Sequence, residues 1–349
     1  MYAGQCFRSM TVPPGDMTET PNCGGKREMD ALSDVLRVAH LTGGVFLQAE
    51  FFEPWCVASQ LNPQYCAPFL GPTSHLILYH YVVEGRLSVQ IEGEEPFEMA
   101  SGEVVMFPRN DMHLLGSRLD LPPVVVSDVI VPSSNGGLYA IRLGEDGART
   151  RLVCGFLGCD SVEGNLLIST LPKALRLNVE EGSAAEWIRS TFQYAANEVA
   201  TGSPGSETVL AKLSELLFVE TVRRYADNLP ECETGWLAGL RDPYVARALA
   251  LFHRDIARSW TVDELGREVG LSRSALADRF TRLIGVAPMH YLANWRMQVA
   301  AQKLRNSSAS LADVANMVGY ESEAAFSRAF KKAFLTAPAT WRRLHSTTA

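Results

Sequence analysis

One sequence pattern occurs twice in the C-terminal part of the chain, first over residues 261–288 and again over residues 310–338. Matching residues lie 49 positions apart at the start of the two copies and 50 apart after a one-residue insertion. The matched residues of the first copy are Leu265, Val269, Gly270, Ser272, Phe280, Ala287 and Pro288. Because the insertion falls where a turn is expected, the repeat predicts two copies of one folded unit.

A hydroxyl residue stands three positions before an acidic residue at the start of each copy, as Thr261 before Glu264 and Ser310 before Asp313. This spacing is that of a capping box or a close relative of it, so a helix is expected to begin at each site. The helix of the first copy should end at Gly270, because glycine tolerates the left-handed backbone of a helix end. A tight turn and a second helix would follow.

The second helix of each copy combines an apolar face with a basic face, which is the form of a recognition helix in the major groove of DNA. We expect base-edge contacts from Ser274, Asp278, Glu323, Ser327 and Arg328. We expect phosphate contacts from Arg273, Arg282, Lys331 and Lys332, and we count Ser322, at the start of its helix, among the DNA-contacting residues. The alternative is a pair of ordinary helical hairpins whose basic residues form only a solvated face. Two matched copies, joined by a segment at 289–306 that lacks Gly and Pro and predicts one rigid helix, favour DNA binding.

These repeats resemble the DNA-binding domain of the AraC/XylS family of transcription regulators. The resemblance also rests on Arg296, Ala300, Leu304, Pro338, Trp341 and Arg342. It covers about residues 240–343 and implies a sequence-specific regulator, not an enzyme, whose two recognition helices enter successive major grooves of double-stranded DNA. An activator of this kind would also contact RNA polymerase. Leu335 departs from the family, which usually has glycine before the final loop.

Charge divides the chain into two parts. Residues 241–349 hold 16 Lys and Arg and 9 Asp and Glu. The preceding residues hold 16 Lys and Arg and 30 Asp and Glu. A basic part joined to an acidic part suits a protein that touches phosphate with one end only. No apolar run approaches the roughly 18 residues of a membrane span and no signal peptide is evident, so we expect a cytoplasmic protein.

The N-terminal part predicts a β-rich domain. Residues 1–28 are rich in Pro and Gly and are expected to form a disordered extension, followed by a short helix at 29–41. Between residues 44 and 131, short alternating runs separated by turn residues predict an all-β sandwich or barrel. We therefore expect an effector-sensing domain over residues 29–180.

This domain resembles the cupin-type sensors of AraC-like regulators. His80 and Glu84 lie four apart on one strand and so should face the same way, and His113 closes the second cupin element. We expect His80, Glu84 and His113 to converge in the barrel and to bind a small-molecule effector. The same residues could hold Zn, Fe or Ni, although Leu78 replaces one histidine of a metal-binding cupin. A cupin without metal is the preferred interpretation, so no cofactor is assigned.

The cysteines are scattered without a CxxC pair, at Cys6, Cys23, Cys56, Cys66, Cys154, Cys159 and Cys232. A structural zinc knuckle is therefore not expected, and buried apolar thiols are the default. Two pairs, Cys56 with Cys66 and Cys154 with Cys159, leave oxidant sensing as an alternative.

Residues 184–200 and 206–228 predict two helices. The second carries an apolar surface, too wide for a lone surface helix, around Leu213, Leu216, Leu217 and Val222. This surface could cover the barrel, but a homodimer fits the family better, so residues 181–228 are predicted to be a dimerisation segment. A linker would follow over residues 229–240, and then a DNA-binding domain over residues 241–345.

The predicted fold is α+β, with a cupin-like β-barrel, a helical dimerisation pair and an all-α domain that holds two helix-turn-helix motifs. The predicted function is a one-component transcription regulator controlled by a small effector. A redox- or metal-responsive regulator remains an alternative. A cupin metalloenzyme fused to a DNA-binding module is less favoured, because one cupin histidine is missing.

Overall fold

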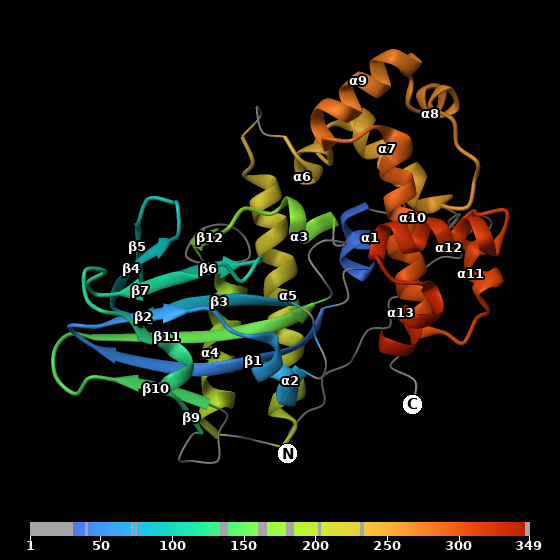
Figure 1. The fold of residues 1–349 in the computed structure, drawn as a ribbon. Coiled ribbons are helices and arrows are strands. Elements are labelled where there is room, and N and C mark those ends of the chain that lie inside the picture. The colour runs from blue at the N-terminus through green and yellow to red at the C-terminus, as the bar shows by residue number, and fades with distance from the viewer. Residues whose placement is uncertain are drawn as a thin grey trace, which may run out of the picture.

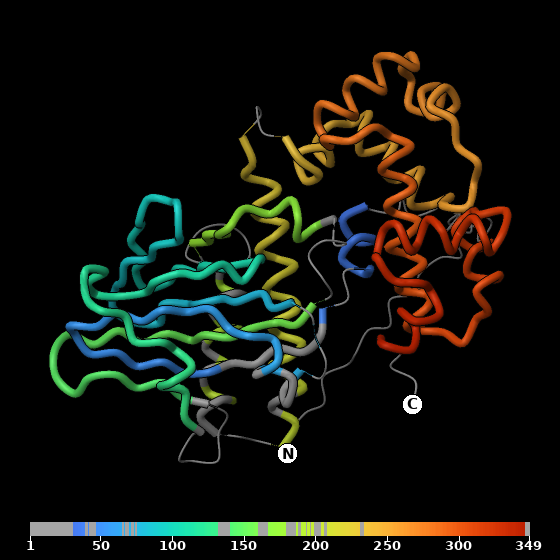
Figure 2. The backbone as a smooth tube through the Cα atoms, viewed as in Figure 1, coloured from blue at the N-terminus to red at the C-terminus, as the bar shows by residue number. Residues whose placement is uncertain are grey.

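The computed structural model describes residues 31–38, 41–70, 73, 75–132, 139–159, 166–178, 185–201, 204–230 and 234–345. The extension predicted over residues 1–28 lies outside this part of the chain. A sheet-rich N-terminal part and a helical C-terminal part lie side by side, with helix α1, Ala31–Val38, between them (Figure 1). In Figure 2 the blue helix α1 lies beside the C-terminal helices.

Two sheets form the N-terminal part, in agreement with the predicted sandwich or barrel. The seven-stranded sheet has the order β12-β6-β3-β11-β1-β10-β9. Its strands are β1 Thr42–Phe52, β3 His75–Glu84, β6 Glu103–Phe107, β9 Ile130–Pro132, β10 Tyr139–Leu143, β11 Arg149–Cys159 and β12 Leu175–Asn178. The five-stranded sheet, in the order β5-β4-β7-β2-β8, consists of β5 Phe97–Ala100, β4 Arg86–Ile91, β7 His113–Gly116, β2 Cys56–Ser59 and β8 Val124–Val125.

Alternation along the strands separates two apolar layers. On β3, Leu76, Leu78 and Val82 belong to the inner core, which we define as the apolar cluster between the two sheets. Ile77 and Tyr79 point to the opposite side of β3 and belong to the outer core, the cluster between the seven-stranded sheet and the helices that cover it. Successive residues of a strand face opposite sides, so one strand serves both layers.

Two long helices, α4 Ala185–Thr201 and α5 Ser206–Asp227, cover the outer face of the seven-stranded sheet. The predicted helices are confirmed, but the predicted dimer seam is wrong in part. Leu217 and Val222 are 3% and 0% exposed and pack within the same chain, while Leu216 is 50% exposed. The wide apolar surface therefore exists because one side of α5 covers the sheet.

In the C-terminal part, every regular element of the described residues is a helix. These are α6 Trp236–Gly239, α7 Pro243–Arg254, α8 Val262–Val269, α9 Arg273–Ile284, α10 Pro288–Asn306, α11 Leu311–Met317, α12 Glu323–Phe334 and α13 Pro338–His345. Both predicted capping boxes are present, at Thr261 with Glu264 and at Ser310 with Asp313. Helix α10 is the predicted connecting helix between the two helix-turn-helix units.

Part of the segment predicted as a linker, residues 229–240, packs into the helical domain. All four residues of α6 are buried, and the indole of Trp236 donates a hydrogen bond to the Tyr291 hydroxyl at 2.9 Å. The buried Trp236 and Leu237 anchor this part of the chain in the helical domain. Among the described helices, none is long and apolar enough to cross a lipid bilayer.

The residue at which the sequence departs from the family pattern adopts a left-handed backbone. Leu335 ends α12 with φ of 56°, and its side chain is 83% exposed. Its counterpart in the first copy is Gly285, with φ of 83°. For an L-residue this backbone conformation is less favourable by about 1–2 kcal/mol, and glycine does not carry this penalty.

Leu335→Gly is therefore expected to stabilise the C-terminal unit. The gain in the free energy of unfolding should be at most about 1 kcal/mol, because glycine also has more entropy in the unfolded chain. Gly285→Ala is the matched control and should destabilise, since the added Cβ would meet no atom within 4 Å beyond its chain neighbours and only backbone strain changes. Urea unfolding measures both variants. A loss of stability in Leu335→Gly would contradict the argument.

Candidate DNA-binding surface and effector pocket

The two recognition helices are held by buried aromatic and aliphatic side chains. Leu276 and Phe280 of α9, and Phe326 and Phe330 of α12, are fully buried. The opposite faces are open to solvent. The candidate DNA-contacting residues Arg273, Ser274, Asp278, Arg282, Ser322, Glu323, Arg328, Lys331 and Lys332 are all exposed, and Ser327 is half-buried.

Two of these residues also make contacts within the protein. The Ser322 hydroxyl accepts a hydrogen bond from the Ala325 amide at 3.2 Å, which makes Ser322 the N-cap of α12. Arg273 lies 3.7 Å from the Asp263 carboxylate, and both side chains are well exposed. An exposed ion pair of this kind contributes little and leaves Arg273 free to turn to a phosphate.

Arg296 of α10 connects the two helix-turn-helix units, a role that the sequence did not show. Its guanidinium donates to the carbonyls of Ile256 at 2.9 Å, Arg258 at 2.8 Å and Gly319 at 3.3 Å. The first two carbonyls belong to the loop before α8, and the third belongs to the turn between α11 and α12. A Cβ on Gly319 would stand 2.6 Å from the Ala257 carbonyl oxygen, so the two units touch closely here.

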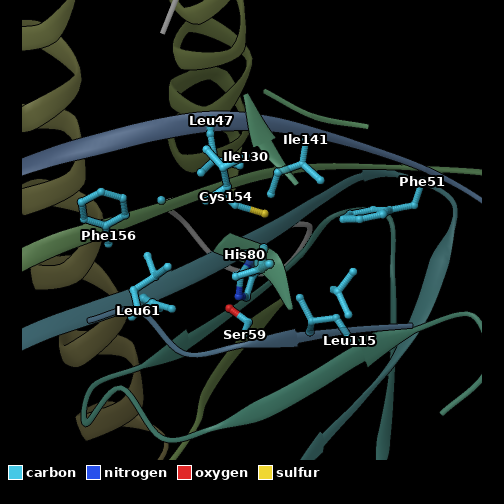
Figure 3. A pocket seen from close by; sticks show the side chains of 14 residues that line it. Leu47, Phe51, Ser59, Leu61, His80, Leu115, Ile130, Ile141, Cys154 and Phe156 are labelled. Carbon is cyan, nitrogen blue, oxygen red and sulfur yellow. The ribbon is translucent and has the colours of Figure 1, made fainter. Parts of the chain in front are cut away.

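A pocket lies between the two sheets of the N-terminal domain (Figure 3). Its cavity volume is about 20 Å³, and the space at its mouth is open to solvent. Its lining residues are Leu47, Phe51, Val57, Ser59, Leu61, Leu78, His80, Leu115, Val126, Ile130, Ile141, Cys154, Gly155 and Phe156. The lining is therefore apolar except for one hydroxyl, one imidazole and one thiol.

His80 lines this pocket and contacts His113, which is not one of the lining residues; the predicted approach of the two histidines is present. Their Nε2 atoms lie 3.0 Å apart, and both residues are buried. The His113 ring stacks on Phe107, with ring centroids 3.6 Å apart, and its Nδ1 lies 2.9 Å from the Asp111 carbonyl oxygen. Stacking and hydrogen bonding thus hold His113 in one orientation.

Burial keeps both imidazoles neutral. It lowers the pKa of His80 well below the ordinary histidine value, and the nearby His113 lowers it further. Burial also lowers the pKa of His113 to about 4, although the hydrogen bond to the Asp111 carbonyl acts in the opposite direction. Transfer of a charged ring into an apolar interior is unfavourable, so both rings stay unprotonated at neutral pH.

The N-terminal domain is therefore expected to lose stability in mild acid. A neutral buried histidine stabilises the fold fully above about pH 6.5, and this contribution is lost as pH falls toward the folded-state pKa, because the unfolded chain takes up the proton first. For His113 the loss between pH 7 and 5 should be about 2 kcal/mol. Urea unfolding at several pH values measures it. His113→Gln should flatten the dependence, and an unchanged slope in that variant would contradict the assignment.

Glu84 does not join the two histidines, which corrects the predicted three-residue site. The pairing of β3 with β11 shifts by one residue, from Val82 opposite Leu152 to Glu84 opposite Arg151. Such a bulge moves the following side chain to the other face of the sheet. Glu84 therefore lies at the surface, 2.9 Å from Arg149 and 2.7 Å from Arg151.

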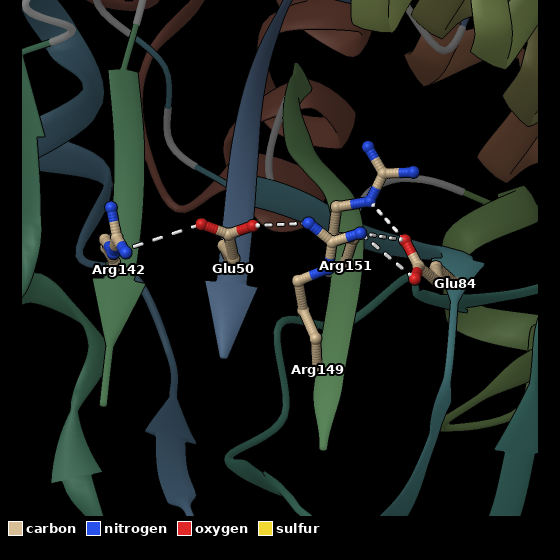
Figure 4. A network of polar contacts seen from close by, with 5 residues as sticks. All are labelled: Glu50, Glu84, Arg142, Arg149 and Arg151. Atoms are coloured by element: carbon tan, nitrogen blue, oxygen red, sulfur yellow. Dashed lines mark hydrogen bonds and ion pairs between the residues drawn. The ribbon is translucent and has the colours of Figure 1, made fainter. Parts of the chain in front are cut away.

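The ion pairs of Glu84 belong to a longer surface network (Figure 4). Arg149 also reaches Glu50 at 3.4 Å, and Glu50 lies 3.9 Å from Arg142. The arginines hold the pKa of Glu84 below its ordinary value. Glu84 thus completes no metal site with His80 and His113, and no cluster of three or more His, Cys, Asp or Glu suited to a metal occurs in the described part of the chain.

The described cysteines are poorly placed for oxidant sensing. Cys154 faces the inner core and Cys159 the outer core, so they lie on opposite faces of β11. Burial raises the pKa of the Cys66 thiol to about 11 and also raises those of Cys56 and Cys154. The thiolate is the reactive form, and these groups hold little of it at neutral pH. Cys6, Cys23 and Cys232 lie outside the described residues.

Comparison with known proteins agrees with both halves of the chain. Residues 30–227 match a cupin family model, and residues 265–344 match a helix-turn-helix domain model. An AraC-like transcription regulator of Streptomyces lividans is 31% identical over 324 residues, which are 90% of this chain and 98% of that protein. A second one, of Streptomyces antibioticus, is 32% identical over 77% of this chain and 87% of its own length.

Among solved structures, the C-terminal domain of AraT, a response regulator from Geobacillus stearothermophilus, is 27% identical. The match covers 31% of this chain and 89% of the AraT domain, with a TM-score of 0.30. The cupin match extends over more than half of the chain, and the first Streptomyces relative aligns over nearly its whole length. The chain belongs to the AraC-like transcription regulators, with a cupin-type N-terminal domain and a C-terminal domain that binds DNA through two helix-turn-helix motifs.

Proposed function

We propose that this regulator is controlled by a small effector that binds in the pocket beside His80 and His113. The observation that carries this proposal is one continuous apolar core that extends from the sensor sheet into the first helix-turn-helix unit. It includes Tyr79 of β3 and Phe218 of α5 as well as Phe252 of α7 and Trp295 of α10. A ligand that shifts the sheet would therefore also strain the packing of the DNA-binding domain.

Helix α1 lies at the centre of this shared core. Ala31, Leu32 and Val35 of α1 are buried there. A buried polar chain runs from its Asp34 into the helical domain. Asp34 Oδ2 lies 3.6 Å from His253 Nδ1, and His253 Nε2 lies 2.8 Å from the Tyr291 hydroxyl, which also accepts from Trp236. The Asp34–His253 contact is too long for a hydrogen bond, so the buried apolar side chains of α1 carry the connection between the two domains.

We also propose that the protein acts as a homodimer on double-stranded DNA. Leu217 and Val222 are excluded from the seam, but large apolar side chains remain exposed on the same helix pair. Trp187 and Tyr194 lie seven apart on α4, and Val209 and Leu216 lie seven apart on α5, each 39–50% exposed. Seven residues make two helical turns, so each pair occupies one side of its helix. If the protein is an activator, RNA polymerase is a further partner.

Two substitutions separate sensing from DNA reading. His80→Ala should abolish the transcriptional response to the effector while DNA binding without effector stays intact, because the residue lies in the pocket and far in the fold from α9 and α12. Arg328→Ala should instead relax base preference at one position by roughly 1–3 kcal/mol, because an arginine can form two bonds to guanine. A reporter assay and DNA titrations measure both.

Two outcomes would contradict the roles assigned to His80 and Arg328. A full effector response in His80→Ala would remove the pocket from the sensing role. If Arg328→Ala loses equal affinity for specific and for random DNA, Arg328 contacts phosphate, as Lys331 and Lys332 are proposed to do.

A further inference from the structure

Arg279 of the first recognition helix, α9, is fixed to the neighbouring helix α7 by two contacts. Its Nε donates a hydrogen bond to Asp242 Oδ2 at 2.6 Å, and its guanidinium carbon lies 4.9 Å from the centre of the Tyr244 ring. Both kinds of contact require a particular direction of the arginine. The Arg279 side chain is 37% exposed and that of Asp242 only 12%, so solvent screens this ion pair less than the exposed pair of Arg273 and Asp263.

The carboxylate that receives Arg279 is itself held in place. Asp242 is the N-cap of α7, and its Oδ1 accepts from the backbone amides of Tyr244 and Val245, each at 3.1 Å. Pro243 follows at the first position of the helix, where its fixed φ suits the helical backbone. One oxygen of the carboxylate thus caps α7 while the other binds α9, so Arg279 is connected to the backbone of α7.

Apolar packing alone gives α9 a narrow support. Of its 12 residues, only Leu276 and Phe280 are buried, and they lie four apart on one side of the helix. Apolar contacts are non-directional, so they oppose separation of α9 from the core more than rotation of α9 about its own axis. Arg279 precedes Phe280 and stands about 100° away around the helix. A directional polar contact at that position opposes the rotation.

Small rotations of α9 matter at the DNA. A helix with its side chains has a radius of about 5–6 Å, so a rotation of about 10° moves the tip of a side chain by about 1 Å. Hydrogen bonds form over a range of donor–acceptor distances only about 0.5 Å wide. Asp278 directly precedes Arg279, and Ser274 lies on the same helix. Both proposed base-reading side chains therefore move with any rotation that the Arg279 contact prevents.

The second helix-turn-helix unit lacks this contact. The residue 50 positions after Arg279 is Ala329, whose methyl group offers neither a charge nor a hydrogen bond. The rings of Phe326 and Phe330 on α12 pack against each other, and Phe330 also contacts Trp341. The chain thus contains one recognition helix with the contact and one without it, which gives each experiment an internal comparison.

We propose that Arg279 is a positioning residue, bound by Asp242 and Tyr244, that fixes the rotation of α9 and thereby determines which base pairs the first recognition helix prefers. Its guanidinium does not bind a DNA phosphate, because Asp242 already balances its charge. This role belongs to DNA binding itself and does not depend on the pocket of the sensor domain.

Selection of bound sequences from a pool of random DNA duplexes tests this role with the full chain. Wild type should yield two half-sites, and replacing Arg328, Lys331 and Lys332 together by alanine identifies the one that α12 contacts. Arg279→Met and Asp242→Asn should reduce the base preferences at the other half-site by at least about fivefold and leave the α12 half-site unchanged. Asparagine caps a helix as well as aspartate does, so Asp242→Asn keeps the start of α7 and removes only the charge that holds Arg279.

Three further variants separate positioning from phosphate contact and from general stability. Arg279→Lys keeps a charge that can pair with Asp242 and should retain more of the preference than Arg279→Met. Arg282→Met should weaken binding to all sequences alike and lower the salt dependence by about one phosphate contact, whereas Arg279→Met should leave the salt dependence unchanged. Arg247→Met removes an exposed charge from α7 and should keep both sets of base preferences. Thermal melts confirm that each variant folds, and Asp242→Asn keeps the test decisive if Arg279→Met does not fold.

Three results would overturn the positioning role. Unchanged base preferences in the folded Arg279→Met and Asp242→Asn variants would show that apolar packing fixes α9. An equal loss of preference at both half-sites would show that the contact only stabilises the domain. A fall in the salt dependence of Arg279→Met, or tighter binding of all sequences by Asp242→Asn, would show that Arg279 binds phosphate.

Discussion

Glutamine in place of Arg296 is expected to remove the protein's preference for one spacing between its two DNA half-sites. The guanidinium holds three backbone carbonyls from both helix-turn-helix units, and glutamine can satisfy at most one or two of them. Each lost bond to a charged donor destabilises by about 1–3 kcal/mol, so the free energy of unfolding should fall by roughly 2–4 kcal/mol. The two recognition helices would then no longer be held at a fixed separation.

DNA titrations measure this effect directly. Wild type should bind an operator much more tightly than the same operator with one base pair inserted between the half-sites, because successive major grooves lie about 10.5 base pairs apart. Arg296→Gln should bind the two operators with similar affinity. Lys303→Gln is the control on the same helix, since Lys303 is exposed. An unchanged spacing preference in Arg296→Gln would show that packing of α10 alone sets the separation.

A second large effect is expected from two neighbouring leucines of α5. Leu217→Glu should unfold the N-terminal domain, because a charge would replace an apolar side chain that is 3% exposed against the sheet. The loss should be at least about 4 kcal/mol. Leu216→Glu should leave stability nearly unchanged, since Leu216 is 50% exposed.

The same pair of variants tests the homodimer. Sedimentation of folded Leu216→Glu should show monomers at concentrations where wild type is a dimer, because the added charge would enter the proposed seam. If Leu217→Glu folds normally but is a monomer, the dimer interface includes the side of α5 that carries Leu217. A monomeric wild type at micromolar concentration would remove the homodimer altogether.

The DNA-binding domain could be predicted almost entirely from the sequence. Its determinants are local: the capping pair Thr261 and Glu264, the glycine at 270 and the N-cap Ser272 act within a few residues of one another. The repeat supplied a second, independent copy of each signal. Side chains such as Phe280 and Phe330 are buried at the expected helical spacing.

The sensor site was only partly predictable, because it depends on strand pairing. His80 and His113 come from different sheets, and the cupin spacing placed them together correctly. The orientation of Glu84 depends on a one-residue shift against β11, which the alternation along β3 alone does not reveal. The outward-facing Arg149 and Arg151 then hold Glu84 at the surface.

The sequence by itself determined the two helix-turn-helix units, the β-rich sensor and the division of charge between them, because capping, helical periodicity and strand alternation act over short distances. Tertiary structure decided which side of α5 is buried, where the segment around Trp236 packs, and that Arg296 joins the two DNA-reading units. Those outcomes depend on which surfaces meet across the fold. An apolar helix face is the same in sequence whether a sheet of its own chain or a second chain covers it.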